Sequence, residues 1–261
     1  MSRLAEILAN KGREIAALRA CPRQRSSRTP LDVARALRPG GGALHLIAEV
    51  KLRSPSAGPL SRALAPDARA LAYAEAGATV VSVLCDGPFF DGSWDHLAAA
   101  RAALDAAGLA VPLLAKEFVL DERQIAEARD RGADAVLLIA RIVDAARLMD
   151  LAHAARDEGL EPLLEVVDEA ELEAALAAGA RVVGVNARDL DSLAMDAARA
   201  ARVLDAIPAG VVAVHLSGLK APADVERIAR GRADAALVGE ALMREDDPRE
   251  ALAAMVAAAR R

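Results

Sequence analysis

Charged and polar residues recur in this sequence directly after short apolar runs. In chain order they are Glu49 and Lys51, Asp86, Lys116 and Glu117, Arg141, Glu165, Asn186 and Arg188, Ser217-Gly218, and Gly239-Glu240. A single charge in such a place is usually a solvated loop residue. Several charges at the ends of apolar runs must pair to offset the cost of desolvation. So many together favour one convergent cluster, either an ion-pair network or a site.

The last two of these places carry glycine, as Ser217-Gly218 and as Gly239-Glu240-Ala241. Glycine lets a ligand approach the backbone closely, and backbone N–H groups at a helix start bind phosphate. We therefore expect a phosphate site there, as is common after the last two strands of a (β/α)8 barrel.

The apolar runs themselves are continuous rather than alternating, which is typical of parallel strands covered by helices on their outer face. The eight runs are 47–48, 80–84, 112–114, 135–139, 162–164, 182–185, 211–214 and 235–238.

Between the runs lie Ala-, Leu- and Arg-rich segments that end in a Gly-Ala junction at 76–79, 131–134 and 178–181, and more loosely at 230–234. We expect each glycine to end its helix in a left-handed conformation. Asp121 with Gln124 and Asp168 with Glu171 resemble capping boxes, and Pro222 suits the first turn of another helix. The pattern predicts a (β/α)8 barrel. An open doubly wound sheet is the alternative, but no G-x-G-x-x-G follows the first run.

An N-terminal helical extension is predicted for residues 1–42, and the barrel for residues 43–261, within a single domain overall. Ser2 can cap a first helix, and a second short helical piece at 31–38 ends at Pro39 and the glycines 40–42. The apolar face of the first helix consists of Leu4, Ile7, Leu8, Ile15 and Leu18.

Composition excludes several classes of protein. Hydrophobic residues make up 54% and charged residues 27%, with a net charge of −5, which excludes a disordered chain. Charges interrupt every apolar stretch, so no membrane span is expected. Acidic balance and few aromatic rings argue against nucleic-acid binding. Glu6 and Glu14 argue against a secretory signal, and only two cysteines favour a reduced, cytoplasmic setting. The four histidines are scattered, so no metal site is expected.

Several motifs of the chain, in their order and spacing, resemble those of the indole-3-glycerol-phosphate synthase family of tryptophan biosynthesis. The first patch reads Ile47-Ala48-Glu49-Val50-Lys51-x-x-Ser54-Pro55-Ser56. Further patches follow in the family's order at 82–84, 90–93, 114–118, 132–139, 165–166, 184–190 and 238–243. The likeness covers nearly the whole chain, including the extra N-terminal helix that the family places before its barrel.

The resemblance implies a cyclisation of 1-(2-carboxyphenylamino)-1-deoxyribulose 5-phosphate to indole-3-glycerol phosphate, with loss of CO₂ and water and without metal or organic cofactor. By motif match, Lys116 is the general acid and Glu165 the general base. Lys51 holds the carboxylate and serves as a second acid, positioned by Glu49, and the division between the two lysines stays open. The substrate-binding residues implied are Ser54, Phe118, Asn186, Arg188, Ser217, Gly218, Gly239 and Glu240. The partner implied is a small phosphorylated substrate, and association with other pathway enzymes is left open.

Two positions depart from the family pattern. Glu117 stands where the family has Asp, and Leu216 stands where it has Glu. His215 should face the opposite side of its strand from Leu216, toward the helices, so it does not replace the missing carboxylate. The hypothesis is a reduced but real synthase activity.

Two alternatives remain at this stage. One is an aldolase that forms a Schiff base on Lys116 or Lys51. The other is a non-catalytic or divergent barrel that binds a related sugar phosphate, for which Leu216 is the support in the sequence.

Overall fold

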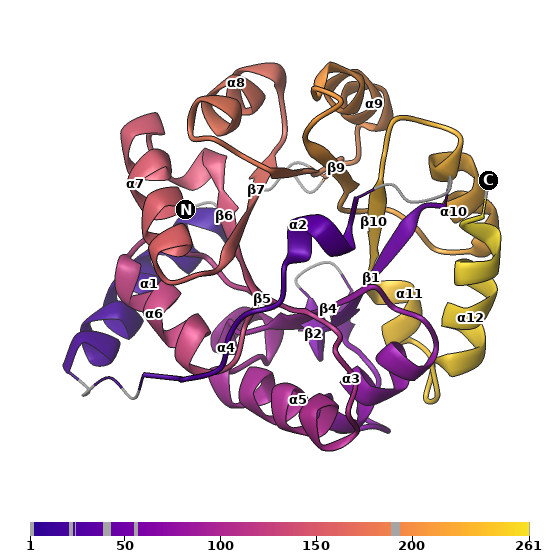
Figure 1. The fold of residues 1–261 in the computed structure, drawn as a ribbon, viewed down its shortest axis with the longest axis horizontal. Coiled ribbons are helices and arrows are strands. Elements are labelled where there is room, and N and C mark those ends of the chain that lie inside the picture. The colour runs from indigo at the N-terminus through magenta and orange to yellow at the C-terminus, as the bar shows by residue number, and fades with distance from the viewer. Residues whose placement is uncertain are drawn as a thin grey trace.

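A closed barrel of eight parallel strands forms the centre of the molecule (Figure 1). The computed structural model describes residues 3–20, 23, 25–38, 43–54, 57–188 and 194–260. The barrel strands are β1 (His45–Val50), β4 (Val80–Leu84), β5 (Leu113–Lys116), β6 (Ala135–Ile139), β7 (Glu161–Val166), β8 (Val182–Val185), β9 (Val212–His215) and β10 (Ala235–Val238). They pair in chain order, and β1 closes the barrel against β10. The predicted (β/α)8 barrel is confirmed.

Helices surround the barrel, and short helical turns follow some of the strands. The helices after the extension are α3 (Pro66–Glu75), α4 (Gly87–Phe90), α5 (Trp94–Ala106), α6 (Glu122–Asp130), α7 (Ala145–Asp157), α8 (Glu169–Ala177), α9 (Ala197–Ala206), α10 (Pro222–Ala229), α11 (Glu240–Met243) and α12 (Arg249–Ala258), with a 3₁₀ turn η1 (Ala140–Ile142). None of the helices in the described part of the chain is long and apolar enough to cross a membrane.

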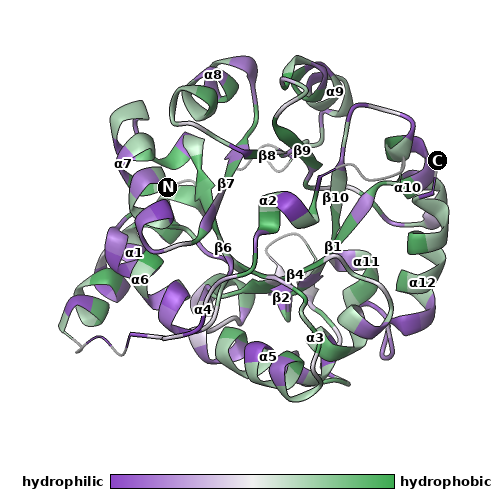
Figure 2. Ribbon diagram, in the orientation of Figure 1, coloured by the Kyte–Doolittle hydropathy of each residue, from purple (hydrophilic) through white to green (hydrophobic). Residues whose placement is uncertain are grey.

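The strands are apolar on both faces because each face meets its own core. One set of side chains, including Ile47, Leu114 and Leu163, fills the barrel interior. The next residues along the strands, such as Ala48 and Ala115, pack outward against the helices. Figure 2 shows the strands largely green and the helices green and purple by turns, as expected for amphipathic helices on an apolar sheet.

Most of the predicted helix boundaries are confirmed. Asp121 and Gln124 form a full capping box, and Pro222 occupies the first turn of α10. At α8 only half of the predicted box forms. Asp168 accepts a hydrogen bond from the Glu171 N–H, but the Glu171 carboxylate accepts from the N–H of Val167 instead of Asp168.

The glycines that end the helices mostly adopt the predicted left-handed conformation. Gly77, Gly132 and Gly179 have φ values of 98°, 90° and 73°. The prediction is wrong for Gly231, which does not have a positive φ. Its N–H donates to the carbonyl of Ile228, the same kind of bond that the other three glycines make. At those three junctions the alanine after the glycine also donates back to a carbonyl five residues earlier, which closes the left-handed turn, whereas Gly231 is followed by Arg232.

The N-terminal extension contacts both ends of the barrel. Helix α1 (Arg3–Ala20) packs against α6, and α2 (Val33–Ala36) inserts Val33 and Ala34 into the barrel interior at the N-terminal ends of the strands (Figure 1). Between them, Arg23 pairs with Asp130 at the end of α6 and with Glu158 directly after α7. Ser2 and residues 39–42, which carry the predicted cap and helix stop, lie outside the described residues, so the domain boundary at residue 42 stays a prediction.

Candidate active site

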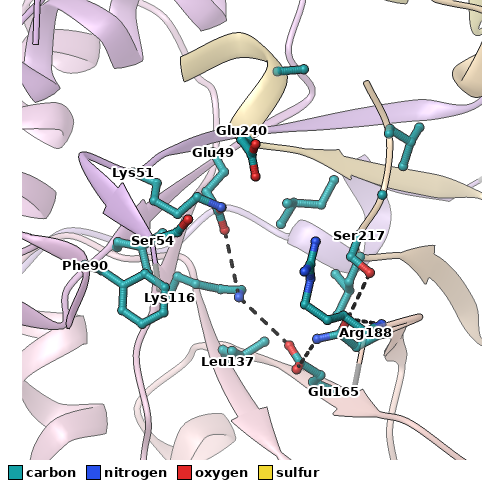
Figure 3. Close-up of a pocket in the computed structure, with 18 of the residues that line it drawn as sticks. Glu49, Lys51, Ser54, Phe90, Lys116, Leu137, Glu165, Arg188, Ser217 and Glu240 are labelled. Carbon is teal, nitrogen blue, oxygen red and sulfur yellow. Dashed lines mark hydrogen bonds and ion pairs between the residues drawn. The ribbon is translucent and has the colours of Figure 1, made fainter. Parts of the chain in front are cut away.

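A cavity of about 480 Å³ opens at the carboxyl ends of the barrel strands (Figure 3). Every residue predicted for the site lines it: Glu49, Lys51, Ser54, Lys116, Phe118, Glu165, Asn186, Arg188, Ser217, Gly218, Gly239 and Glu240. Pro55, Ser56, Asp189 and Leu190, which belong to the quoted motifs, lie outside the described residues. Because the parallel strands of a barrel all end at the same face, residues that follow six different strands meet at one mouth.

Two lysines and two glutamates form the charged centre of this cavity. The ammonium Nζ of Lys116 lies 3.8 Å from Oε1 of Glu49 and 3.9 Å from Oε2 of Glu165. Lys51 Nζ lies 2.7 Å from Oε2 of Glu49. Burial favours the neutral form of Glu49, but Lys51 and Lys116 outweigh it and hold the pKa of this carboxyl below its ordinary value. Glu49 thus sits ionised between the two lysines.

Asn186 fixes the orientation of the Glu165 carboxylate. Its Nδ2 donates to Glu165 Oε1 at 2.9 Å, and its Oδ1 accepts from the N–H of Arg188 and from Ser217 Oγ, each at 2.9 Å. Oε2 of Glu165 is buried and receives no hydrogen bond among the described residues. The carboxylate therefore keeps one oxygen available on the side that faces Lys116 (Figure 3).

An apolar wall lies on the β4 and β5 side of the cavity. The rings of Phe90 and Phe118 are 6.1 Å apart between centroids, and Leu84 lies beside them in the lining. Leu4 and Ile7 of α1 complete the wall. Sequence reasoning missed Leu4 and Ile7 as site residues, because an apolar face on a helix gives the same signal whether it packs on a core or on a ligand pocket.

Glycines shape the opposite side, at the ends of β9 and β10. A Cβ at Gly239 would lie 2.5 Å from Glu49 Oε2, so any larger residue there would push the Glu49 carboxylate out of its present position. Gly218 has a φ of 93°. Glu240 pairs with Arg244 at 2.7 Å, and this pairing holds the pKa of Glu240 below its ordinary value.

Three strand-end charges do not join the charged centre, which corrects the expectation of a single convergent cluster. Arg141 is drawn away to the start of α8, where it pairs with Glu171 and Asp168. The carboxylates of Asp86 and Glu117 are buried, and both bind the ammonium group of one lysine from α1. Glu117 still belongs to the cavity lining, but its carboxylate pairs with this lysine and not with Lys51 or Lys116.

Leu216 faces the cavity, and its Cδ1 lies 2.5 Å from where a Cβ on Gly184 would be. It therefore fills the space beside Gly184, packed in the interior cluster with Leu137 and Leu237. His215 is buried and does not line the cavity. Burial lowers the pKa of its imidazole, and the positive charge of Arg227 on α10 lowers it further. This agrees with the predicted outward placement of His215.

Fold and site together define a (β/α)8-barrel enzyme with acid–base groups and glycine-bearing loops at the strand ends. The family model "Indole-3-glycerol phosphate synthase" matches residues 4–255. The chain belongs to this indole-3-glycerol phosphate synthase family, whose members act on a small phosphorylated substrate.

Named relatives agree with this assignment. The chain is 44% identical over 229 residues to the indole-3-glycerol phosphate synthase of Mycobacterium ulcerans, covering 88% of this chain and 82% of the relative. It is 48% identical to indole-3-glycerol phosphate synthase 2 of Streptomyces coelicolor, covering 83% and 81%.

Among solved structures, a 3-hexulose-6-phosphate synthase aligns with a TM-score of 0.64 at 18% identity, covering 82% of this chain and 99% of that one. At that identity the likeness concerns the fold alone. No group of His, Cys, Asp and Glu side chains in the described part of the chain is placed to hold a metal ion.

Proposed function

We propose that this protein cyclises 1-(2-carboxyphenylamino)-1-deoxyribulose 5-phosphate to indole-3-glycerol phosphate, releasing CO₂ and water. The observation that carries the proposal is the placement of Lys116 and Glu165. One is a cationic acid and the other a buried carboxylate base, borne by different strands and facing each other 3.9 Å apart in one cavity. Two such groups can serve the proton transfers of a single reaction.

In this proposal Lys116 protonates the ribulose carbonyl oxygen while the ring carbon that bears the carboxylate attacks the carbonyl carbon. Loss of CO₂ restores the aromatic ring. Glu165 then removes a proton from the carbon bonded to the ring nitrogen, and the hydroxyl on the neighbouring carbon leaves as water with a proton from Lys51, the second acid. Glu49, 2.7 Å from Lys51 and 3.8 Å from Lys116, positions both ammonium groups.

Substrate binding divides between the two sides of the cavity. The aromatic ring packs against Phe118 and the apolar wall, where it loses water contact. Backbone N–H groups near Ser217, Gly218 and Gly239 bind the phosphate. The remaining polar lining, from Ser54, Arg188 and Glu240, contacts substrate hydroxyls, and Lys51 holds the substrate carboxylate. The side-chain amide of Asn186 makes hydrogen bonds to three protein groups, one of them Glu165. In this proposal Asn186 therefore orients the base Glu165 as well as the substrate.

Leu216 lowers the rate in this proposal without abolishing the reaction. A carboxylate at that place would add a proton acceptor close to the charged centre, whereas Leu216 presents an apolar surface continuous with Leu137 and Leu237. The acid–base pair itself is intact. We place the reaction in the cytoplasm, because Cys85 is a buried free thiol and the chain has only one other cysteine.

A fluorescence assay of indole formation from the anthranilate–ribulose phosphate tests the proposal. Wild type should turn over, and Lys116→Ala should lose about 100-fold or more in kcat. Arg230→Ala, which removes an exposed cation directly after α10, is the control and should match wild type.

Two other outcomes would replace the proposal. Binding of the substrate without turnover by wild type would favour a non-catalytic barrel. A lysine adduct with a sugar phosphate, trapped by borohydride, would favour an aldolase.

A further inference from the structure

Lys11 of α1 is a fully buried lysine that the proposed chemistry does not use. Its Nζ lies 2.7 Å from Oδ1 of Asp86, 2.9 Å from Oε1 of Glu117 and 2.7 Å from Oε2 of Glu14. Asp86 follows β4 and Glu117 follows β5. A single ammonium group thus joins the ends of two neighbouring barrel strands to the N-terminal helix.

Both buried carboxylates are connected by the backbone to groups of the cavity. Asp86 Oδ2 accepts from the N–H of Phe89 and caps α4, the turn that carries Phe90 into the cavity. Glu117 lies between Lys116 and Phe118 in the chain, and its Oε1 accepts from the N–H of Phe118. The two rings that meet at 6.1 Å therefore each follow a carboxylate held by the same ammonium group.

The position of Lys11 on its helix strengthens this connection. Ile7 and Leu4, which line the cavity, lie four and seven residues before Lys11 and so share its face of α1. The buried ion cluster and the apolar wall are thus two parts of one contact between α1 and the strand ends.

Lysine is rare in this chain, and its few lysines lie at or beside the cavity. The sequence holds 29 arginines but only four lysines. Three of these, Lys51, Lys116 and Lys220, line the cavity, and the fourth is Lys11 directly behind it. A compact ammonium group with three donors fits between three carboxylates where a planar guanidinium would not.

We propose that Lys11 is a positioning residue of the reaction: it locks α1 to the ends of β4 and β5, and so sets the places of the general acid and of the aromatic wall. The inference rests on the proposed synthase function, because it assigns roles to Lys116 and to the Phe90–Phe118 wall.

The test compares Lys11→Met with wild type in the indole assay. A matched control is Arg13→Met, which removes an exposed charge from the same helix. We expect kcat/KM of Lys11→Met to fall about 100-fold, the loss that a displacement of about 1 Å can cause. KM should rise because the wall moves, and kcat should fall because the acid moves. Arg13→Met should match wild type.

Removal of Lys11 leaves two buried carboxylates unpaired, which is strongly destabilising. The triple variant Lys11→Met, Asp86→Asn, Glu117→Gln therefore replaces the whole ion cluster by neutral groups of similar shape. We expect it to fold and to show the same rise in KM and fall in kcat.

Several results would overturn the inference. One is a folded variant, single or triple, whose kcat/KM stays within about twofold of wild type. Another is a fall in kcat at unchanged KM that follows the folded fraction, since a purely structural role gives that result. Failure of both variants to fold would place Lys11 in the folding core and equally overturn it. Absence of indole formation by wild type would instead refute the proposed function.

Discussion

Glu117 provides a sharp test of the electrostatics behind the cavity, because one ammonium group faces two carboxylates in a space closed to water. The side chains of Asp86 and Glu117 are 0% and 1% exposed. Burial raises the pKa of Glu117 from its ordinary 4.5 to about 7, and attraction to Lys11 offsets only part of this rise. Each pKa unit corresponds to about 1.4 kcal/mol, so ionised Glu117 lowers the free energy of unfolding by about 3 kcal/mol.

The sign of the effect follows from the raised pKa. The folded protein holds the Glu117 proton more tightly than the unfolded chain, so this stability is fully present below pH 4.5 and is lost as the pH rises through 7. Glu117→Gln carries a neutral side chain at every pH. We expect it to be more stable than wild type by about 3 kcal/mol at pH 9, and by less than about 1 kcal/mol at pH 5.

Urea unfolding followed by circular dichroism at the two pH values measures this difference. Glu14→Gln is the matched control, because Glu14 binds the same ammonium group but its side chain is 34% exposed. It should not gain stability at pH 9. If Glu117→Gln is no more stable than wild type at pH 9, Lys11 stabilises both ionised carboxylates and the raised pKa of Glu117 is refuted. An equal gain in stability at pH 5 would refute it as well, because the gain would then not come from the ionisation of Glu117.

Three further substitutions probe the cavity in the indole assay. Leu216→Glu should raise kcat by about tenfold by restoring a proton acceptor, whereas Leu216→Gln should not; no gain, or a loss, would show a site rebuilt around leucine. Gly239→Ala should lower kcat/KM, because its Cβ would lie 2.5 Å from Oε2 of Glu49, while Gly210→Ala, with open space around it, should be silent. Asn186→Leu should lower kcat by roughly 10- to 100-fold, since it removes a hydrogen bond to the base carboxylate; unchanged kcat would remove Asn186 from the positioning network.

The barrel could be predicted from the sequence because its strands are buried on both faces. The predicted runs 80–84, 135–139, 182–185 and 235–238 coincide with β4, β6, β8 and β10. The short antiparallel pair β2 (Arg53–Ser54) and β3 (Gly58–Pro59) was not predicted, since two residues per strand give no periodic signal. Gly231 shows a similar limit, because its looser junction, with Arg232 between the glycine and Ala233, does not take the left-handed conformation of the Gly-Ala junctions.

The charged centre of the site could also be predicted, because parallel strands in a barrel bring their carboxyl ends to one mouth. What could not be predicted is which strand-end charges turn inward. Asp86 and Glu117 resemble Glu165 in sequence, but both carboxylates pair with a lysine that lies 75 residues before one and 106 before the other, and not with the lysines of the charged centre. No local pattern carries such a long-range pairing.

The same long-range contacts explain why the barrel strands alone do not complete the cavity. Leu4 and Ile7 supply part of the apolar wall, and Lys11 supplies the counter-charge for two strand-end carboxylates; all three belong to α1. An ammonium group buried with carboxylates contributes little net stability compared with an apolar cluster of the same volume. What it adds is register, since the two acceptor oxygens on Asp86 and Glu117 fix how far α1 lies along the ends of β4 and β5. The N-terminal helix is therefore best understood as part of the site, and its ion cluster as the element that aligns the aromatic wall with the acid.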